Sequence, residues 1–92
     1  MKIVESDEYK IRLKEITNYI KRDKKSAAIN FAKELRKKIR KLPVNPYMCP
    51  TSQYFSEKNV RDMTFKKYTI VYEIKPDEKV IEILDIFNRN KP

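Results

Sequence analysis

Five basic residues in one segment have the spacing that gathers positive charge on a single surface. Residues 27–41 mix cations with apolar residues at helical spacing, so that at 100° per residue the two kinds fall on opposite sides. The cations are Lys33, Arg36, Lys37, Arg40 and Lys41. Cations gathered in this way bind anions, and each phosphate that they neutralise releases counterions. The segment predicts either a surface that attracts an acidic partner or an ordinary solvated helix face.

The charge of the whole chain is concentrated in the same region. The 92 residues include 22 basic and 13 acidic side chains, which gives a net charge of +9. Residues 21–41 hold ten of the basic and two of the acidic residues, and the rest of the chain is close to balanced. An excess of this size favours an acidic partner, such as a nucleic acid, an acidic protein segment or an anionic surface. No aromatic residue is interleaved with the five cations at 33–41, so base stacking there has no support.

The composition excludes several kinds of active site. The chain has no histidine, which excludes the common zinc sites, the serine-histidine nucleophile pair and imidazole acid-base chemistry. It has no glycine, which excludes the glycine-rich loops that cradle nucleotide phosphates. We therefore expect neither a metal site nor a cofactor.

The single cysteine and the N-terminus bear on the compartment. Cys49 cannot form a disulfide within the chain, which fits a reducing compartment. Because no histidine can activate it, Cys49 is interpreted as a loop residue rather than a nucleophile. The N-terminus lacks the apolar segment of a signal peptide, and no apolar run is long enough to span a membrane. We expect a cytoplasmic protein with no membrane partner.

The first half of the chain has the apolar spacing of two helices. Ser6 precedes two acidic residues and can cap a helix over Asp7–Asp23. A second helix is predicted over 27–41, with Ser26 as its cap. It should end there because Pro43 disfavours helical geometry at the residue before it. Each helix has one apolar side, which predicts an antiparallel hairpin. The apolar positions are Tyr9, Leu13, Ile16 and Ile20 on the first helix and Ala28, Phe31, Leu35, Ile39 and Leu42 on the second.

The second half of the chain predicts three strands after a proline-containing loop. Prolines exclude helix and central strand from residues 42–58. Runs rich in Val, Ile, Tyr and Phe follow at 59–65, 68–74 and 79–87. The sequence "KPDEK" is a good turn between the last two runs. The sequence "KK" between the first two lacks the Gly or Asn of a tight hairpin, so we expect a slightly longer or bulged connection there.

Together these elements predict an α+β fold in a single domain of residues 1–92. A short β-prone run at 2–5 precedes the helical hairpin, and the three later strands form an antiparallel meander. With the first strand on the edge of the meander, the result is a four-stranded, mostly antiparallel sheet with two helices on one face.

This order of elements resembles the RelE/ParE superfamily of toxins from type II toxin-antitoxin systems. The residues that carry the resemblance are "AAINFAKELRKKIRKLPVNPYM" on the second helix and the loop, "VRDMTFKKYTIVYEI" across the first hairpin, and "ILDIFNRNKP" at the end. The resemblance covers essentially the whole chain, with two departures. Cys49 stands where many relatives have glycine, and Asn88 stands where a histidine is often found. The resemblance implies a growth inhibitor, of the kind linked to plasmid stabilization, that a cognate antitoxin neutralises.

The superfamily has two main activities, and the resemblance implies different site residues for each. RelE-like members cut mRNA on the ribosome, whereas ParE-like members act on DNA gyrase and are not nucleases. For a RelE-like mRNA interferase, the catalytic candidates are Arg61, Lys66, Lys67 and Arg89. Tyr68 matches a family tyrosine, but Thr69 stands where RelE-like sequences place a catalytic arginine. The tyrosine that should follow Arg89 is missing before the printed sequence ends.

We therefore favour a ParE-like, non-enzymatic function and keep the ribosome-dependent mRNA interferase as the alternative. Arg61 is then interpreted as a surface or antitoxin-facing residue of an edge strand, where Asp62 or Glu73 could pair with it. The candidate contacts with the target are the five cations of the second helix together with Arg61, Asn88 and Arg89. A nucleic-acid-binding module unrelated to toxicity is a third and weaker alternative.

The resemblance also implies an antitoxin whose disordered, often acidic tail folds over the toxin. Such a tail could lie in the groove between the helical hairpin and the sheet, where it would add a strand to an exposed edge. The candidate antitoxin contacts are Ile11, Tyr19, Tyr54 and Phe55. Alternatively, these four residues complete the core.

Overall fold

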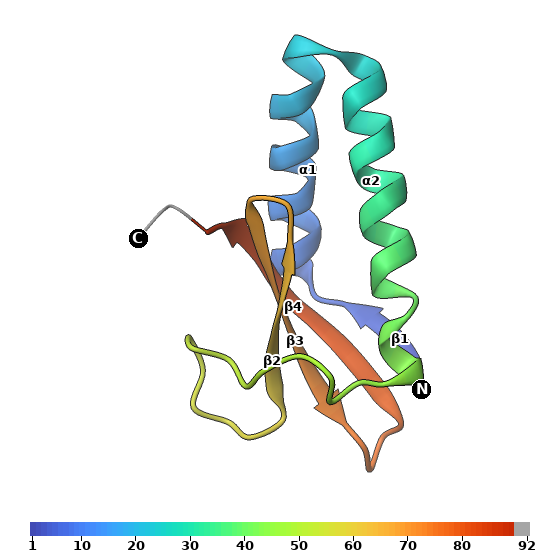
Figure 1. Cartoon of the computed structure of the whole chain (residues 1–92), viewed down its shortest axis with the longest axis vertical. Coiled ribbons are helices and arrows are strands. Elements are labelled where there is room, and N and C mark those ends of the chain that lie inside the picture. Colours follow the sequence, from blue (N-terminus) through green and yellow to red (C-terminus); the bar gives the residue numbers. More distant parts are fainter. Residues whose placement is uncertain (90–92) are drawn as a thin grey trace.

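Four strands form one mixed sheet in the computed structural model, which describes residues 1–89 (Figure 1). They are β1 (Lys2–Glu5), β2 (Val60–Phe65), β3 (Tyr68–Lys75) and β4 (Val80–Asn88), and their order in the sheet is β1-β4-β3-β2. The β2–β3 and β3–β4 pairs are antiparallel, and β1 pairs with β4 in parallel. The predicted α+β fold, with the first strand on the edge of a three-stranded meander, is confirmed.

A helical hairpin connects β1 to the meander. α1 (Asp7–Asp23) spans the predicted residues, and Ser6 caps it because its Oγ accepts a hydrogen bond from the Tyr9 backbone N–H at 3.1 Å. A single extended residue, Lys24, then reverses the chain, and its N–H donates to the Ile20 carbonyl at 3.1 Å. So tight a reversal leaves no separate loop between the helices.

α2 (Lys25–Ile39) differs from its prediction at both ends. It begins earlier than predicted because the chain reverses at Lys24, so Ser26 lies within the first turn and does not cap the helix. It also ends earlier, and the chain continues into the short 3₁₀ helix η1 (Leu42–Val44), which has a proline in its first turn. The predicted second helix is therefore confirmed, but its predicted boundaries are wrong.

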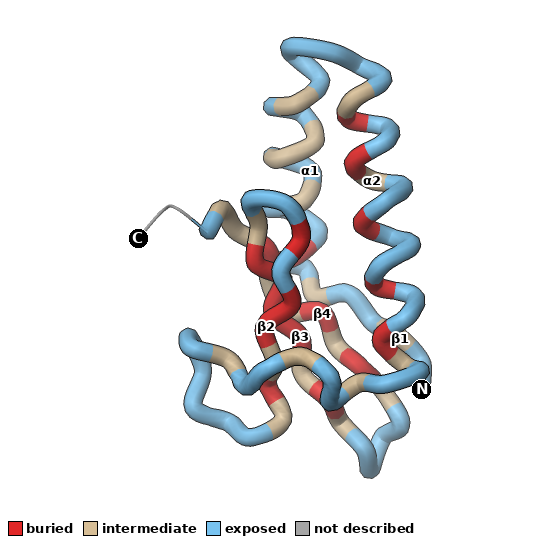
Figure 2. Tube along the Cα trace, in the orientation of Figure 1, coloured by how far each residue is buried: buried red, intermediate tan, exposed pale blue. Residues whose placement is uncertain are grey.

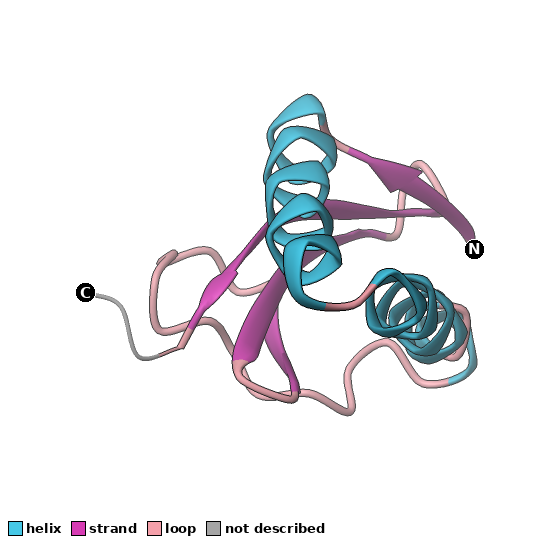
Figure 3. Ribbon diagram, turned by 90° about the horizontal axis from the view of Figure 1, so that it is seen from above, coloured by secondary structure: helices cyan, strands magenta, loops and turns pink. Residues whose placement is uncertain are grey.

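The core lies between the helical hairpin and one face of the sheet (Figure 2). The predicted apolar side of α2 is buried, and its residues are Ala28, Phe31, Leu35 and Ile39, followed by Leu42. In α1, Tyr9 is 1% exposed, whereas Leu13, Ile16 and Ile20 are only partly buried. Seen from above, α1 lies across the sheet and α2 runs beside it (Figure 3). The tip of the hairpin extends beyond the strands (Figure 1), which leaves the later turns of α1 less covered.

Two short turns join the strands of the meander. Residues 66–67 connect β2 directly to β3, so the predicted longer or bulged connection is wrong. Lys66 adopts a backbone φ of 55°, a conformation that glycine usually supplies. An ion pair of 3.1 Å between the Lys66 Nζ and the Glu34 Oε2 ties this turn to α2. The turn predicted at "KPDEK" is confirmed, since residues 76–79 connect β3 to β4.

The loop between η1 and β2 folds back along the outer edge of β2. The Ser52 N–H donates to the Val60 carbonyl at 2.9 Å, and the Asp62 N–H donates to the Pro50 carbonyl at 3.1 Å. The loop is therefore ordered against the sheet, and it covers the first half of the β2 edge.

β1 is shorter than β4 and leaves part of β4 open. β1 pairs only with Val80–Ile83. Ser6 then leaves the sheet: its N–H donates to the Ile83 carbonyl at 2.9 Å and its Oγ to the Leu84 carbonyl at 2.8 Å. Beyond that point no strand among the described residues pairs with this side of β4.

Candidate functional site

The open part of β4 and the facing side of α1 border a groove, which we call the tyrosine groove. Its volume is about 750 Å³. It is lined by Arg12, Glu15, Ile16 and Tyr19 of α1, Tyr54 of the loop, Tyr68 of β3, and Asp85, Ile86, Phe87 and Asn88 of β4. Three tyrosines and several apolar side chains thus surround a hollow beside an unpaired strand edge. An extended peptide can add to such an edge through its backbone while its side chains enter the hollow.

An ion pair joins the two walls of the tyrosine groove. The Arg12 Nε lies 2.9 Å from the Glu8 Oε1 and 3.2 Å from the Asp85 Oδ1, so it connects α1 to β4. The hydrogen bond with Glu8, followed by the charge of Asp85, raises the pKa of Arg12 above its usual value. Because these groups are partly exposed, the pair adds little stability. The pair places the polar side chains of Arg12 and Asp85 beside the apolar wall, where they could form hydrogen bonds with the backbone of a bound peptide.

Aromatic contacts fix the opposite side of the tyrosine groove. The rings of Tyr54 and Phe87 meet edge to face, with their centroids 4.8 Å apart. Tyr68 is half-buried and meets Phe31 edge to face at 5.4 Å. Burial, and to a smaller extent the neighbouring Tyr19, raises the pKa of Tyr68. Like other tyrosines at neutral pH, Tyr68 keeps its hydroxyl proton and can donate a hydrogen bond to a ligand.

The four predicted antitoxin contacts are all exposed, so the alternative in which they complete the core is wrong. Tyr19 is 67% exposed and Tyr54 is 53% exposed, and both line the tyrosine groove. Ile11 and Phe55 are exposed outside its lining. The fold thus brings two of the four residues to one groove.

A second groove, the lysine groove, lies between α2, the following loop and β2. Its volume is about 400 Å³. It is lined by Glu34, Lys37, Lys38 and Lys41 beside Leu42, Asn45, Met48, Cys49 and Met63. Of the five predicted cations of the second helix, Lys37 and Lys41 line this groove. Lys33, Arg36 and Arg40 are exposed outside its lining.

Arg61 holds the loop against the sheet. Its Nη1 donates hydrogen bonds to the Cys49 carbonyl at 2.9 Å and to the Tyr47 carbonyl at 3.2 Å. Its guanidinium carbon also lies 5.2 Å from the centre of the Tyr47 ring. The predicted pairing of Arg61 with Asp62 or Glu73 is wrong, because the loop carbonyls take the guanidinium and the Asp62 Oδ2 accepts a hydrogen bond from the backbone of the same loop.

Three of the four nuclease candidates meet at the β2–β3 turn, and the fourth does not. The Arg89 N–H donates to the Lys67 carbonyl at 2.7 Å, and the Arg89 Nη1 donates to the Lys66 carbonyl at 3.4 Å. Arg61 lies five residues before Lys66 on β2, which is roughly 16 Å along a strand. The structure therefore does not bring the four cations to one point. Residues 90–92, the last of the segment "ILDIFNRNKP" that carries part of the resemblance, lie outside the described residues.

Several residues that shape the two grooves have no clear signal in the sequence. The Arg12–Asp85 pair joins distant parts of the chain, and no local pattern marks it. Met48 and Met63 border the lysine groove from the loop and from β2. A weak signal existed for Met48, since it is an apolar residue in a proline-containing stretch where no regular element could cover it.

Two features are absent from the described residues, 1–89. No helix there has the length and apolar character needed to cross a membrane. No group of three or more His, Cys, Asp or Glu side chains there could hold a metal ion.

The strand order, the helical hairpin and the meander form the α+β fold expected from the resemblance to the RelE/ParE superfamily. The chain belongs to the family described as the ParE toxin of the type II toxin-antitoxin system, parDE, whose family model matches residues 5–91. Among solved structures, a chain from the chromosomal ParDE TA system of P. aeruginosa is similar, with 16% identity and a TM-score of 0.75. The match covers 96% of this chain and 95% of that one, and at this identity it concerns the fold. A search of curated proteins found no match.

Proposed function

We propose that this ParE-family toxin arrests growth by binding DNA gyrase and that a cognate antitoxin neutralises it. The family match supports the toxin function. The closer resemblance to ParE-like than to RelE-like sequences supports gyrase as the target. A toxin with this target acts in the cytoplasm. Inhibition of this kind is a protein-protein interaction and uses no catalytic residue or cofactor.

The position of Arg61 is the observation that carries the proposal. Cleavage of mRNA needs a group that removes the 2′-hydroxyl proton, cations on the phosphorus centre and a group that protonates the leaving oxygen. The Arg61 guanidinium donates hydrogen bonds to two loop carbonyls, and it lies far from the other candidate cations. Thr69 stands where a RelE-like sequence has its arginine. A binding function fits this arrangement better than a nuclease function does.

A ribosome-dependent mRNA interferase is the second candidate function, and the β2–β3 turn is the observation that favours it. Lys66, Lys67 and Arg89 gather there beside Tyr68. The Tyr68 hydroxyl is the group there that could protonate a leaving oxygen, although its raised pKa makes it a weaker acid. Against this function, the Lys66 Nζ is already paired with Glu34.

We assign the antitoxin to the tyrosine groove. The open edge of β4 offers backbone hydrogen bonds to an extended segment, except at the Ile86 N–H, which donates to the Asp85 Oδ1 at 2.8 Å, and Tyr19 and Tyr54 offer apolar contact. The proposed target contacts are the exposed cations Lys33, Arg36, Lys37, Arg40 and Lys41, together with Asn88 and Arg89. Arg61 is the weakest of the predicted target contacts, because it is half-buried and bound to the loop. Asn88 lines the tyrosine groove, so an antitoxin bound there would cover part of the target surface.

A paired assay separates the two candidate functions. Purified toxin is added to a translating extract and, separately, to a gyrase supercoiling reaction. We expect inhibited supercoiling and intact mRNA. Codon-positioned mRNA cuts that disappear in Arg89→Ala would contradict the proposal and support the interferase. Lys58→Ala serves as the matched control, because Lys58 is an exposed cation outside both grooves.

A further inference from the structure

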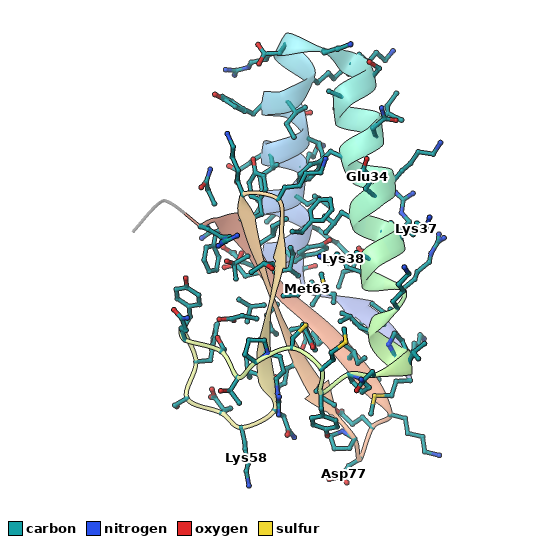
Figure 4. The ribbon with its side chains drawn as sticks, viewed as in Figure 1. Glu34, Lys37, Lys38, Lys58, Met63 and Asp77 are labelled. Carbon is teal, nitrogen blue, oxygen red and sulfur yellow. The ribbon has the colours of Figure 1, made fainter. Side chains whose placement is uncertain are left out.

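The lysine groove combines an apolar floor with a basic rim. Leu42 and Met63 are each 4% exposed and form the floor, while Met48 is 72% exposed at the rim. Lys37 and Lys38 of the rim come from α2, across from Met63 on β2 (Figure 4), and Lys41 follows the end of α2. A hollow of about 400 Å³ of this kind accepts an apolar side chain. Methionines adapt their shape to such a side chain because they are unbranched and polarizable.

The positive charge around the lysine groove is not neutralised within the described part of the chain. Lys37 and Lys41 form no ion pair among residues 1–89. The Lys38 Nζ donates to a backbone carbonyl, that of Thr64 at 2.8 Å. Glu34 is the acidic residue of the lining, and Lys66 already pairs with it at 3.1 Å. A complementary ligand therefore has acidic groups beside an apolar one.

Much of the neighbouring edge of β2 is already occupied. Its outward backbone groups belong to Val60, Asp62 and Thr64, because successive residues alternate in direction. The loop bonds to the Val60 carbonyl and the Asp62 N–H, and Lys38 bonds to the Thr64 carbonyl. This edge therefore offers little room for an added strand, and a ligand in the lysine groove binds mainly through side chains, as an amphipathic helix does when it lies in a groove.

The spacing of the rim lysines matches such a helix. Lys37 and Lys41 are one helical turn apart on α2 and its C-terminal extension, about 6 Å along the axis. Two acidic residues at positions i and i+4 of a helical ligand have the same spacing. A nucleic acid fits less well, because none of the residues that line the groove is aromatic and bases would have nothing to stack on.

We infer that the lysine groove docks an acidic amphipathic helix of the toxin's target protein. The ligand helix places an apolar side chain between Met48 and Met63 and two acidic side chains against Lys37 and Lys41. That this helix belongs to the toxin's target rests on the proposed function, whereas its acidic and apolar chemistry is inferred from the groove alone. The antitoxin has a separate place, since the tyrosine groove and the lysine groove share no lining residue.

The test begins with a display library of helical peptides. Each peptide has about 15 residues, roughly four helical turns, with acidic residues at i and i+4 beside a randomised apolar position. Selected peptides are titrated against wild-type toxin, the double variant Lys37→Glu/Lys41→Glu, and Met48→Ser. We expect each variant to raise the Kd by about tenfold or more, since the lysine variant removes the charge contacts and Met48→Ser removes the apolar contact.

A charge-matched control is available on the same chain. Lys10→Glu/Lys58→Glu makes the same change in net charge at two exposed lysines outside both grooves, and it should leave the Kd unchanged. Lys58 lies in the loop at the end of the molecule opposite the helical tip (Figure 4). Three results would overturn the inference: a library without binders that depend on the groove, displacement of the peptide by the cognate antitoxin, or an oligonucleotide whose binding depends on the lysines but not on Met48.

A second arm links the groove to the target. The same variants are assayed for inhibition of gyrase supercoiling, and we expect Lys37→Glu/Lys41→Glu to lose potency by about tenfold or more, while the control double variant keeps it. Equal potency of both double variants would contradict the inference without affecting the proposed function. If wild-type toxin does not inhibit gyrase, the proposed function fails, and the peptide titration alone decides whether the groove binds such a helix.

Discussion

Arg61 and Tyr72 face each other across β2 and β3, and both hold the proline-containing loop. The Arg61 Nη1 donates to the carbonyls of Tyr47 and Cys49, and the Tyr72 hydroxyl donates to the Pro46 carbonyl at 2.7 Å. Two opposed side chains thus satisfy three loop carbonyls that would otherwise lack a partner near the sheet. The loop in turn forms one wall of the lysine groove.

Tyr72 should make the stability of the protein sensitive to alkaline pH. Burial, and to a smaller extent the neighbouring Cys49, raises the pKa of Tyr72 in the folded state well above the unfolded value of about 10. The stabilisation is complete below about pH 10 and is lost as the pH rises, because the unfolded state releases this proton first. In urea titrations, Tyr72→Phe should reduce the fall in the free energy of unfolding between about pH 9 and about pH 11 by roughly 1 kcal/mol.

The control for this prediction is Tyr19→Phe, which removes a phenol that is 67% exposed. Tyr19→Phe makes the same chemical change at an exposed position away from the Pro46 carbonyl. At neutral pH, Tyr72→Phe should also lower the free energy of unfolding by about 1 kcal/mol, because the Pro46 carbonyl loses its donor. A pH dependence that is the same in Tyr72→Phe and wild type would contradict this account of Tyr72.

At the scale of elements, the difference in length between β1 and β4 creates the tyrosine groove. β1 covers β4 only as far as Ile83, and α1 then crosses the sheet above the uncovered part (Figure 1). The side chains that line the groove come from three distant parts of the sequence, namely α1, the loop, and the strands β3 and β4. An added segment would therefore contact both layers of the fold at once.

The aromatic walls of the tyrosine groove should dominate the affinity for the antitoxin. Tyr19→Ala and Tyr54→Ala should each weaken antitoxin binding by about 1–2 kcal/mol, roughly a fivefold to thirtyfold rise in the Kd, because aromatic anchors in grooves contribute most of the binding energy. Isothermal titration with the cognate antitoxin measures this. Val44→Ala is the matched control, since Val44 is 87% exposed and lies outside both grooves.

Phe55→Ala sharpens the same test. Phe55 was predicted as an antitoxin contact from the sequence, but it lies outside the lining of the tyrosine groove. Its replacement should change the affinity less than Tyr54→Ala does. If Phe55→Ala and Ile11→Ala weaken binding more than the two groove tyrosines do, the antitoxin binds somewhere else on the toxin.

The elements were largely predictable because their signals are local. The spacing of Phe31, Leu35 and Ile39 marks the buried side of α2, and the runs of β-branched and aromatic residues mark the meander. The errors lie where two elements meet. Lys24 reverses the chain alone because the two helices pack against each other, and Lys66 accepts a positive φ within a turn that α2 helps to hold.

The candidate site was less predictable because it depends on contacts between distant residues. The exposed cations of α2 follow from helical periodicity. Tyr19, a predicted antitoxin contact, lies off the apolar side of α1 by the same periodicity. Nothing in the local sequence reveals that Arg61 binds loop carbonyls, or that Met48 and Met63 meet beside the lysines. Such contacts exist only once the loop has folded back along β2.

As a whole, the molecule presents two binding surfaces of different chemistry. The tyrosine groove is aromatic and lies next to an open strand edge, whereas the lysine groove has a basic rim on the helix that carries most of the excess charge. In the proposed function, an acidic target would be attracted to the second surface before contact, because the field of ten basic residues in 21–41 acts over several ångströms. An antitoxin tail would be held at the first surface by contact.

The central claim is that the toxin acts by binding gyrase rather than by catalysis. The most direct measurement is a titration of purified gyrase with purified toxin, with residual supercoiling activity as the readout. The account predicts that activity falls in proportion to the toxin added, reaches its minimum when gyrase is saturated, and returns when the cognate antitoxin is added. Unchanged supercoiling in a large excess of a toxin preparation that arrests growth would contradict it.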